Sequence, residues 1–383
     1  MTPQILPMLR RLALAAAFLA GAAPAFAQTI ETQAKQAYIF DMKTGAVLLE
    51  KNADELMPPS SMSKMMTIHM LFEKLQKGDV KLTDEFPVSE RAWRIQGSKM
   101  FVPLGARVKV EDLIRGIVVQ SGNDACVVVA EALAGSEEAF AEQMTKKGRE
   151  IGLTKTVFKN ASGWPHPDHL TTARDLALIA KHTIEQFPEY YKYYAELNYT
   201  YNGIKQGNRN PLLYKQNGAD GLKTGHTEAA GYGLTASVKR GDRRIVMVVN
   251  GLPSMKARAQ ETESLIEWAF REYENYALFK AGETVQAANV WLGESKTVPL
   301  VAAEDLVVTL PRRARQGMKV TAVFQEPIPS PIQKGQQAGK LVIAAPGVPT
   351  KELPLIAGEN VAQLGPAGRI GAAVSYLLFG AQK

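Results

Sequence analysis

The chain has 383 residues, of which 46% are hydrophobic and 22% are charged, a composition typical of folded proteins that argues against disorder. The formal net charge is +7, but no dense run of Lys and Arg would follow a phosphate backbone, so we expect no nucleic-acid partner. Cys126 is the only cysteine, which excludes an internal disulfide, and we expect it to serve buried packing rather than chemistry.

Residues 1–27 predict a secretory signal peptide. Arg10 and Arg11 precede an apolar run over 12–23, and a small-x-small cleavage site, Ala-Phe-Ala, ends at residue 27. An uncleaved membrane anchor is the alternative, but the apolar run is shorter than the roughly 20 residues that span a bilayer. Because the segment holds two arginines and no acid, its removal lowers the net charge from +7 to +5. That mild excess suits an anionic wall or membrane surface.

The segment that follows predicts an α+β domain with a largely antiparallel sheet. Strand-like runs at 37–41 and 46–49 flank a turn and predict a hairpin. Pro58 and Pro59 stop the chain, and 61–76 is apolar on all sides, which predicts a buried helix. Further elements are expected in chain order: helices at 110–116, 124–133, 137–151 and 172–183, a loop at 160–171, strands at 231–238 and 244–249, and a closing helix at 264–276.

From about residue 280 the pattern changes to short alternating runs separated by Gly and Pro, which predicts a small all-β domain. The tail is apolar with few cations and predicts an amphipathic helix at a membrane interface, with a packed or frayed C-terminus as the alternative. The expected division is a signal peptide at 1–27, a catalytic domain at 28–276, a β-rich domain at 277–365 and a tail at 366–383.

The first candidate catalytic motif is Ser-x-x-Lys, from Ser61 to Lys64. Residues i and i+3 share a helix face, so the Ser61 hydroxyl and the Lys64 amine are expected to meet. A serine attacks well once a base takes its proton, and Lys64 is that base if burial and nearby cations keep it neutral. Because Ser61 follows two prolines, its N–H is expected at a helix start, free to stabilise an oxyanion. A chance, solvated Ser–Lys pair is the alternative.

Two further motifs are weak when each is taken alone. Ser121-Gly122-Asn123 is expected in a loop, where Ser121 relays protons between Lys64 and the leaving group and the Asn123 amide holds a substrate peptide bond. The alternative is a simple turn.

Lys223-Thr224-Gly225 is expected to open a strand. Lys223 and Thr224 offer a cation and a hydroxyl to a carboxylate, and Gly225 gives a substrate backbone room to approach. The N–H of His226 would complete the oxyanion hole with that of Ser61.

In this order, the three motifs resemble those of β-lactamases and penicillin-binding proteins. Longer matches over 61–67, 121–126 and 220–227 resemble the low-molecular-mass D-alanyl-D-alanine carboxypeptidases of Gram-negative bacteria, of the penicillin-binding protein 5 and 6 type. The resemblance covers nearly all of the mature chain. It implies a penicillin-recognising, transpeptidase-like domain followed by a small β-sandwich-like domain, at the periplasmic face of the inner membrane.

The resemblance also implies an activity. The chain would remove the terminal D-alanine from peptidoglycan pentapeptides through an acyl-enzyme on Ser61, within peptidoglycan remodelling and cell shape, and β-lactams would acylate the same serine. Arg258 and Arg209 would neutralise the terminal carboxylate, since an Arg fork binds a carboxylate at two points; a surface salt bridge is the alternative for each. No metal or cofactor is expected, because His166 and His169 lie in a proline-rich loop, expected to be solvated, without a third ligand.

Three competing functions use the same residues. A class A β-lactamase needs a glutamate that activates the deacylating water, but Tyr194 stands where that glutamate belongs, two residues before Glu196. An endopeptidase that cuts cross-links remains open, although the appended β-domain favours the carboxypeptidase. A wall-binding protein with a dead site is disfavoured by the intact motifs.

Overall fold

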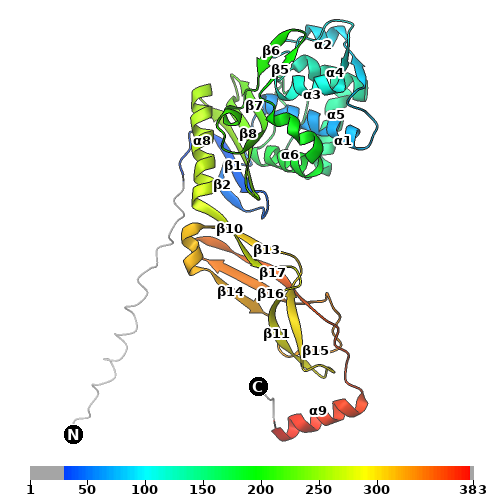
Figure 1. Cartoon of the computed structure of the whole chain (residues 1–383), viewed down its shortest axis with the longest axis vertical. Helices are drawn as coiled ribbons and strands as arrows, with labels where there is room; N and C mark the ends of the chain where they lie inside the picture. Colours follow the sequence, from blue (N-terminus) through cyan, green and yellow to red (C-terminus); the bar gives the residue numbers. More distant parts are fainter. Residues whose placement is uncertain (1–29, 380–383) are drawn as a thin grey trace, which may run out of the picture. The chain divides into compact units, whose positions relative to one another are not determined.

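The computed structural model describes residues 30–379, which form two compact units divided between Asn275 and Tyr276 (Figure 1). The predicted signal peptide, 1–27, and the last four residues of the tail lie outside the described residues. The first unit is α+β and the second is all-β, as the sequence predicts. The predicted fold class is therefore confirmed.

The first unit is built on a five-stranded sheet in which all neighbouring strands run antiparallel. The predicted hairpin is confirmed, with Ile39 opposite Leu49. The strand order is β2-β1-β9-β8-β7, which brings the N-terminal hairpin beside strands about 200 residues later. The strands are β1 (Gln36–Asp41), β2 (Val47–Lys51), β7 (Ala219–Thr227), β8 (Gly231–Arg240) and β9 (Arg243–Leu252).

Both faces of this sheet are buried. Successive side chains of a strand point to opposite faces, so neighbouring buried residues of one strand belong to two different cores. In β9, Ile245 and Met247 join the core shared with helix α8 (Met255–Glu272). Val246 and Val248 join the larger core formed with the other helices. Helix α8 therefore covers one face and the remaining helices cover the other (Figure 1).

The helices on the second face follow the predicted order with small shifts at their ends. The first predicted helix, 61–76, begins instead as a 3₁₀ turn, Ser60–Ser63, that continues into α1 (Lys64–Gln76). The others are α2 (Glu90–Arg94), α3 (Val110–Val118), α4 (Asn123–Ala134), α5 (Glu137–Glu150), α6 (Ala173–Gln186) and α7 (Pro188–Tyr191), with 3₁₀ turns at Lys192–Ala195 and Pro211–Tyr214. Two short antiparallel pairs lie outside the main sheet: β3 (Glu85–Pro87) pairs with β4 (Arg107–Lys109), and β5 (Asn198–Tyr201) forms a hairpin with β6 (Ile204–Gly207).

The predicted closing helix, 264–276, is wrong at both ends. Helix α8 already begins at Met255, because the Ser254 side chain accepts a hydrogen bond from Ala257 N and caps the helix there. It ends at Glu272, where the backbone becomes extended and β10 (Tyr273–Phe279) starts.

The second unit contains a six-stranded sheet in the order β14-β16-β17-β12-β11-β15, and β10 pairs with β13. Its core is aliphatic and includes Leu300, Leu341 and Leu355. The tail forms α9 (Pro366–Phe379), and no helix within residues 30–379 is long and apolar enough to cross a membrane. The strands are β11 (Thr284–Trp291), β12 (Thr297–Ala302), β13 (Leu306–Pro311), β14 (Lys319–Val323), β15 (Ile328–Pro329), β16 (Gln337–Ala345) and β17 (Val348–Ala357), with a 3₁₀ turn at Arg312–Gly317.

Candidate active site

Ser61 and Lys64 meet where the 3₁₀ turn passes into α1. The Lys64 Nζ lies 2.8 Å from the Ser61 Oγ, so the contact expected from the i, i+3 spacing forms. Ser61 is half-buried, whereas the Lys64 side chain is fully enclosed. The hydroxyl is thus open to a substrate while the amine lies behind it.

The Lys64 amine has two other partners, and both can only accept hydrogen bonds. One is Asn123 Oδ1 at 2.8 Å and the other is the carbonyl oxygen of Ser162 at 2.6 Å. The Asn123 amide is fixed in this orientation, because its Nδ2 donates to the carbonyl of Gln96. A neutral amine has two N–H groups and one lone pair. If the N–H groups satisfy the two acceptors, the lone pair is left pointing at Ser61.

Burial also makes the neutral form of Lys64 accessible. Loss of hydration, helped by the positive charge of Arg209, lowers the pKa of the Lys64 ammonium to about 8. The nearby carboxylates of Asp124 and Glu137 act in the opposite direction. A lysine with such a pKa is partly neutral near physiological pH, as a general base requires.

Ser121 is held in a conformation that ordinary residues rarely adopt. Its φ of 61° lies in the left-handed region, which costs a non-glycine residue roughly 1–2 kcal/mol. Its hydroxyl is buried and has no hydrogen-bond partner within the described residues. Backbone strain and an unpaired buried hydroxyl together are typical of a functional position.

Asn123 is the first residue of α4 rather than part of a loop, which corrects the predicted position. The next residue, Asp124, accepts hydrogen bonds from the backbone N–H groups of Met100 and Phe101 at 2.9 and 2.8 Å. The start of α4 is therefore tied to the 98–102 segment, and this keeps Asn123 beside Lys64.

Lys223 was predicted to open a strand, but it lies in the middle of β7. Its side chain is buried, and within residues 30–379 its Nζ donates a hydrogen bond to the Thr224 carbonyl alone, at 3.2 Å. Burial first, and then the positive charges of Lys64 and Arg209, hold the pKa of Lys223 well below its usual range. A charge at this position is therefore stabilised strongly by any anion that approaches it.

Gly225 is needed for a reason that differs from the prediction. A β-carbon there would overlap the Ser60 hydroxyl and lie 3.1 Å from the Pro59 carbonyl oxygen. The missing side chain therefore lets β7 pack against the turn that carries Ser61. Thr224 is buried, and the exposed His226 stacks on Tyr232 with 3.9 Å between the ring centroids.

Arg258 and Arg209 lie together, near the end of β7 that holds His226 and the start of β8 that holds Tyr232. The Arg258 Nη2 contacts the Arg209 carbonyl at 3.5 Å, its guanidinium lies 5.7 Å from the centre of the Tyr232 ring, and its buried Nε has no partner within the described residues. Burial lowers the pKa of Arg258 to about 10. Arg209 donates to Ser98 Oγ at 2.7 Å. Neither guanidinium forms an ion pair with a carboxylate of residues 30–379, so the group suits an anionic ligand.

A groove of about 570 Å³ lies beside Asn123. Gln96 and Trp164 line it, and the Gln96 carbonyl accepts the hydrogen bond from Asn123 Nδ2. The Trp164 ring is 45% exposed and offers an apolar wall.

Two predictions outside the three motifs have different outcomes. Cys126 is buried, as predicted, and burial raises the pKa of its thiol to about 12. His169 was expected to be solvated, which is wrong: it is 2% exposed, and its Nε2 lies 2.8 Å from Ser63 Oγ. His166 is exposed, and across residues 30–379 no cluster of three or more His, Cys, Asp or Glu could hold a metal.

The sequence analysis missed the carbonyl of Ser162, which completes the surroundings of Lys64. Every residue has a backbone carbonyl, so no residue type identifies this position. The nearest signal is the Asn-x-Ser-Gly pattern of 160–163, which is typical of a tight turn.

Two family models match the chain. That of the D-alanyl-D-alanine carboxypeptidases (Peptidase S11) matches residues 22–254, and that of the penicillin-binding protein 5 C-terminal domain matches residues 273–363. The D-alanyl-D-alanine carboxypeptidase DacC of Escherichia coli K12 is 39% identical, over 95% of this chain and 94% of its own length. DacA of Haemophilus influenzae is 36% identical, over 88% of this chain and 87% of its own length.

Two solved structures are similar to this chain over different shares of its length. Penicillin-binding protein 5 from Haemophilus influenzae has a TM-score of 0.80 and 36% identity, covering 88% of this chain and 100% of that one. Penicillin-binding protein D2 from Listeria monocytogenes, in its ampicillin-bound form, has a TM-score of 0.59 and 27% identity, covering 64% of this chain and 100% of that one.

Proposed function

We propose, for a chain that belongs to the D-alanyl-D-alanine carboxypeptidase family, that Ser61 is the nucleophile and Lys64 the general base of its reaction. As a member of that family the chain is a hydrolase that acts on the D-Ala-D-Ala ends of peptidoglycan peptides. The observation that carries the residue assignment is the enclosed Lys64 amine between Ser61 Oγ and two oxygens that can only accept.

Acylation begins when the neutral Lys64 takes the Ser61 proton. The Ser61 oxygen attacks the carbonyl carbon between the two D-alanines, and the oxyanion forms near the N–H groups of Ser61 and His226. The amide bond breaks as the leaving amine takes a proton, supplied through Ser121 or directly from Lys64. Water then hydrolyses the ester and frees the shortened peptide.

Ser121 fits the role of proton relay because its buried hydroxyl has no other partner within the described residues. Asn123 keeps one amide N–H for a substrate carbonyl, since Gln96 takes only one of the two. The groove beside Asn123 takes the preceding part of the stem peptide, with Trp164 as its apolar wall.

The cations at the far end of the site select a free C-terminus. The amine of Lys223 and the guanidinium groups of Arg258 and Arg209 have no carboxylate partner within residues 30–379, and Thr224 and Gly225 continue the strand that carries Lys223. A terminal D-Ala carboxylate supplies the missing anion. This requirement for a free carboxylate supports a carboxypeptidase over an enzyme that cuts within a cross-link.

We also propose that β-lactams acylate Ser61 and leave slowly. Tyr194 is buried, and the nearby Glu196 carboxylate is bound by Arg115 at 2.9 Å, so neither activates a deacylating water. The penicillin-binding protein from Listeria that was solved with ampicillin bound is similar to 64% of this chain. Rapid penicillin hydrolysis, as in a β-lactamase, is therefore not expected.

The proposed location is the periplasm. Export would use the signal peptide at 1–27, and the helix of the 366–383 tail would attach the enzyme to the outer face of the inner membrane. In this proposal, residues 28–276 form the catalytic domain and residues 277–365 form a β-rich domain.

The test combines intact-protein mass spectrometry after penicillin treatment with release of D-alanine from a pentapeptide. We expect one penicilloyl adduct that maps to Ser61 and persists for the length of the assay, together with D-alanine release. The Ser61→Ala variant should show neither. D-Alanine release by Ser61→Ala, or fast turnover of penicillin by the wild type, would refute the assignment.

A further inference from the structure

The carbonyl of Ser162 is one of the two acceptors that orient the Lys64 amine, and it belongs to a loop rather than to a helix or strand. A loop carbonyl keeps its place only if the backbone around it is fixed. The contacts that hold residues 160–164 therefore bear on the chemistry at Ser61.

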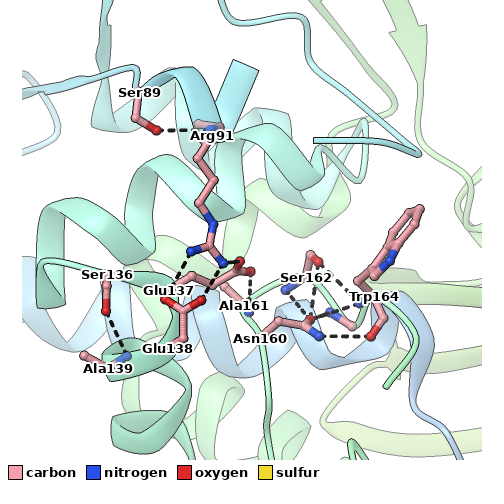
Figure 2. Close-up of polar contacts among 12 residues, drawn as sticks. Ser89, Arg91, Ser136, Glu137, Glu138, Ala139, Asn160, Ala161, Ser162 and Trp164 are labelled. Carbon is pink, nitrogen blue, oxygen red and sulfur yellow. Dashed lines mark hydrogen bonds and ion pairs between the residues drawn. The ribbon is translucent and has the colours of Figure 1, made fainter. Parts of the chain in front are cut away.

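Asn160 fixes this loop from within (Figure 2). Its Oδ1 accepts hydrogen bonds from the backbone N–H groups of Gly163 and Trp164 at 2.8 and 3.0 Å, and its Nδ2 donates to the Trp164 carbonyl at 2.9 Å. The side chain closes a tight turn around Ser162. These contacts set the shape of the loop but do not attach it to the rest of the unit.

Two buried side chains attach the loop to the helices. The Thr67 hydroxyl on α1 donates to the Ala161 carbonyl at 2.6 Å, and the second attachment is Glu137, in the first turn of α5. Its carboxylate is buried, and its Oε1 accepts from the backbone N–H of Ala161 at 3.0 Å, one residue before the carbonyl that binds Lys64. Its Oε2 accepts from Arg91 on α2 at 2.8 Å, and Arg91 also pairs with the exposed Glu138 (Figure 2). A continuous path of contacts thus runs from Arg91 through Glu137 and the loop to Lys64.

We propose that Glu137, held by its ion pair with Arg91, is a positioning residue that fixes the Ser162 carbonyl and so directs the Lys64 lone pair at Ser61. This inference rests on the proposed function, since it assumes that Lys64 is the base. Glu137 contacts neither Ser61 nor Lys64 in the described structure and acts through the loop.

Glu137 has a second, electrostatic effect on Lys64. Its negative charge raises the pKa of Lys64, against the larger lowering by burial. The other titratable and charged groups that face Lys64 are Asp124 and Cys126 on α4, Arg209, His169 and Lys223. Loss of the Glu137 charge alone should therefore lower the pKa of Lys64, while loss of its hydrogen bond should displace the loop.

Two substitutions separate these effects. Glu137→Gln keeps an acceptor for Ala161 N but removes the charge, whereas Glu137→Ala removes both. The readout is the second-order rate constant for acylation of the full chain by a fluorescent penicillin, measured from pH 6 to pH 10. Glu138→Ala is the matched control, because Glu138 shares Arg91 but does not touch the loop.

We expect Glu137→Ala to lower the high-pH plateau roughly tenfold or more, the effect of losing a hydrogen bond to a charged group. Glu137→Gln should keep most of the plateau and move the midpoint to lower pH, and Glu138→Ala should match the wild type. The inference would be overturned if the high-pH rate of Glu137→Ala equalled that of the wild type. It would also be overturned if both Glu137 variants lost the same share of that rate.

If Glu137→Ala does not fold, Glu137→Asp decides, because the shorter side chain keeps the charge but withdraws the acceptor from Ala161 N. A lowered plateau supports the inference, and a plateau equal to that of the wild type refutes it. Failure of the proposed function would look different. In that case the wild type itself would carry no adduct on Ser61, or Lys64→Ala would be acylated as fast as the wild type.

Discussion

Gly163 packs so closely against Ser60 that a β-carbon at position 163 would overlap the Ser60 carbonyl oxygen. The same atom would lie 3.2 Å from the backbone nitrogen of Ser61. Gly163 also has a φ of 77°, which other residues adopt only with strain. The loop that supplies the Ser162 carbonyl and the turn that carries the nucleophile therefore fit together only with glycine at this position.

We expect Gly163→Ala to reduce acylation by penicillin about a hundredfold or more, because displacements near 1 Å at reacting groups have effects of this size. The measurement is the acylation rate constant at a pH high enough for the rate to have levelled off, with the melting temperature recorded alongside.

Gly135→Ala is the control for Gly163→Ala. Gly135 has a similar φ of 82°, but nothing lies within 4 Å of a β-carbon there. It should lose about 1–2 kcal/mol of stability from backbone strain and keep its activity. Equal acylation rates in the two variants would show that the close contact at Gly163 does not matter for the nucleophile.

The pKa of about 8 for Lys64 predicts how activity depends on pH. Only the neutral amine accepts a proton, so acylation should rise about tenfold per pH unit below pH 8 and level off above it. Lys64→Arg keeps a positive charge that cannot be removed, and it should lose about 10²–10⁴-fold. The profile is measured from pH 5.5 to pH 10 with circular dichroism to confirm folding at each point. A rate that does not change between pH 6 and pH 9 would contradict Lys64 as the base.

Two buried histidines predict that the first unit loses stability in acid. Burial lowers the pKa of both His69 and His169 to about 4 from an ordinary value near 6.5. Below pH 6.5 the unfolded chain binds protons that the native state does not take up, so the free energy of unfolding should fall until about pH 4. At 1.36 kcal/mol per pKa unit, each histidine contributes up to about 3 kcal/mol.

The measurement for these histidines is urea unfolding followed by near-ultraviolet circular dichroism at pH 7, 6, 5 and 4. His169→Gln removes one titrating group, and its amide can still bond to Ser63 Oγ. Its unfolding free energy should therefore fall less steeply between pH 6.5 and pH 4. A slope equal to that of the wild type would show that His169 is not buried in its neutral form.

Local parts of the site could be predicted from local patterns. The contact between Ser61 and Lys64 spans three residues and follows from helical spacing. The contacts of Lys64 with Asn123 and with the Ser162 carbonyl join positions 59 and 98 residues apart. No periodicity encodes such distances, so the prediction that the motifs converge came from resemblance, and the carbonyl was missed.

The wrong predictions also have physical causes. The segment before Lys223 contains two glycines, which weaken a strand pattern, yet pairing with β8 extends β7 back to Ala219, since tertiary contacts override local propensity. His169 lies in a sequence rich in proline, but a hydrogen bond to Ser63 and the surrounding core bury it. The start of α8 was placed too late, because residues 255–263 are largely polar and carry little apolar periodicity.

Arg258 should recognise the terminal carboxylate of the substrate, and this predicts a pairing between variant and substrate. With a peptide that ends in D-Ala-D-Ala, Arg258→Ala should lower kcat/KM roughly tenfold to a hundredfold, the range for a lost hydrogen bond to a charged group. The wild type should lose a similar factor when the peptide ends in a carboxamide, whereas Arg258→Ala should lose little more, because the partner of the carboxylate is already gone. Lys256→Ala, an exposed change on the same helix, is the control and should match the wild type with both peptides. If the carboxamide lowered the rate of Arg258→Ala as much as that of the wild type, the carboxylate would be bound elsewhere, with Lys223 and Arg209 as the remaining cations of the site.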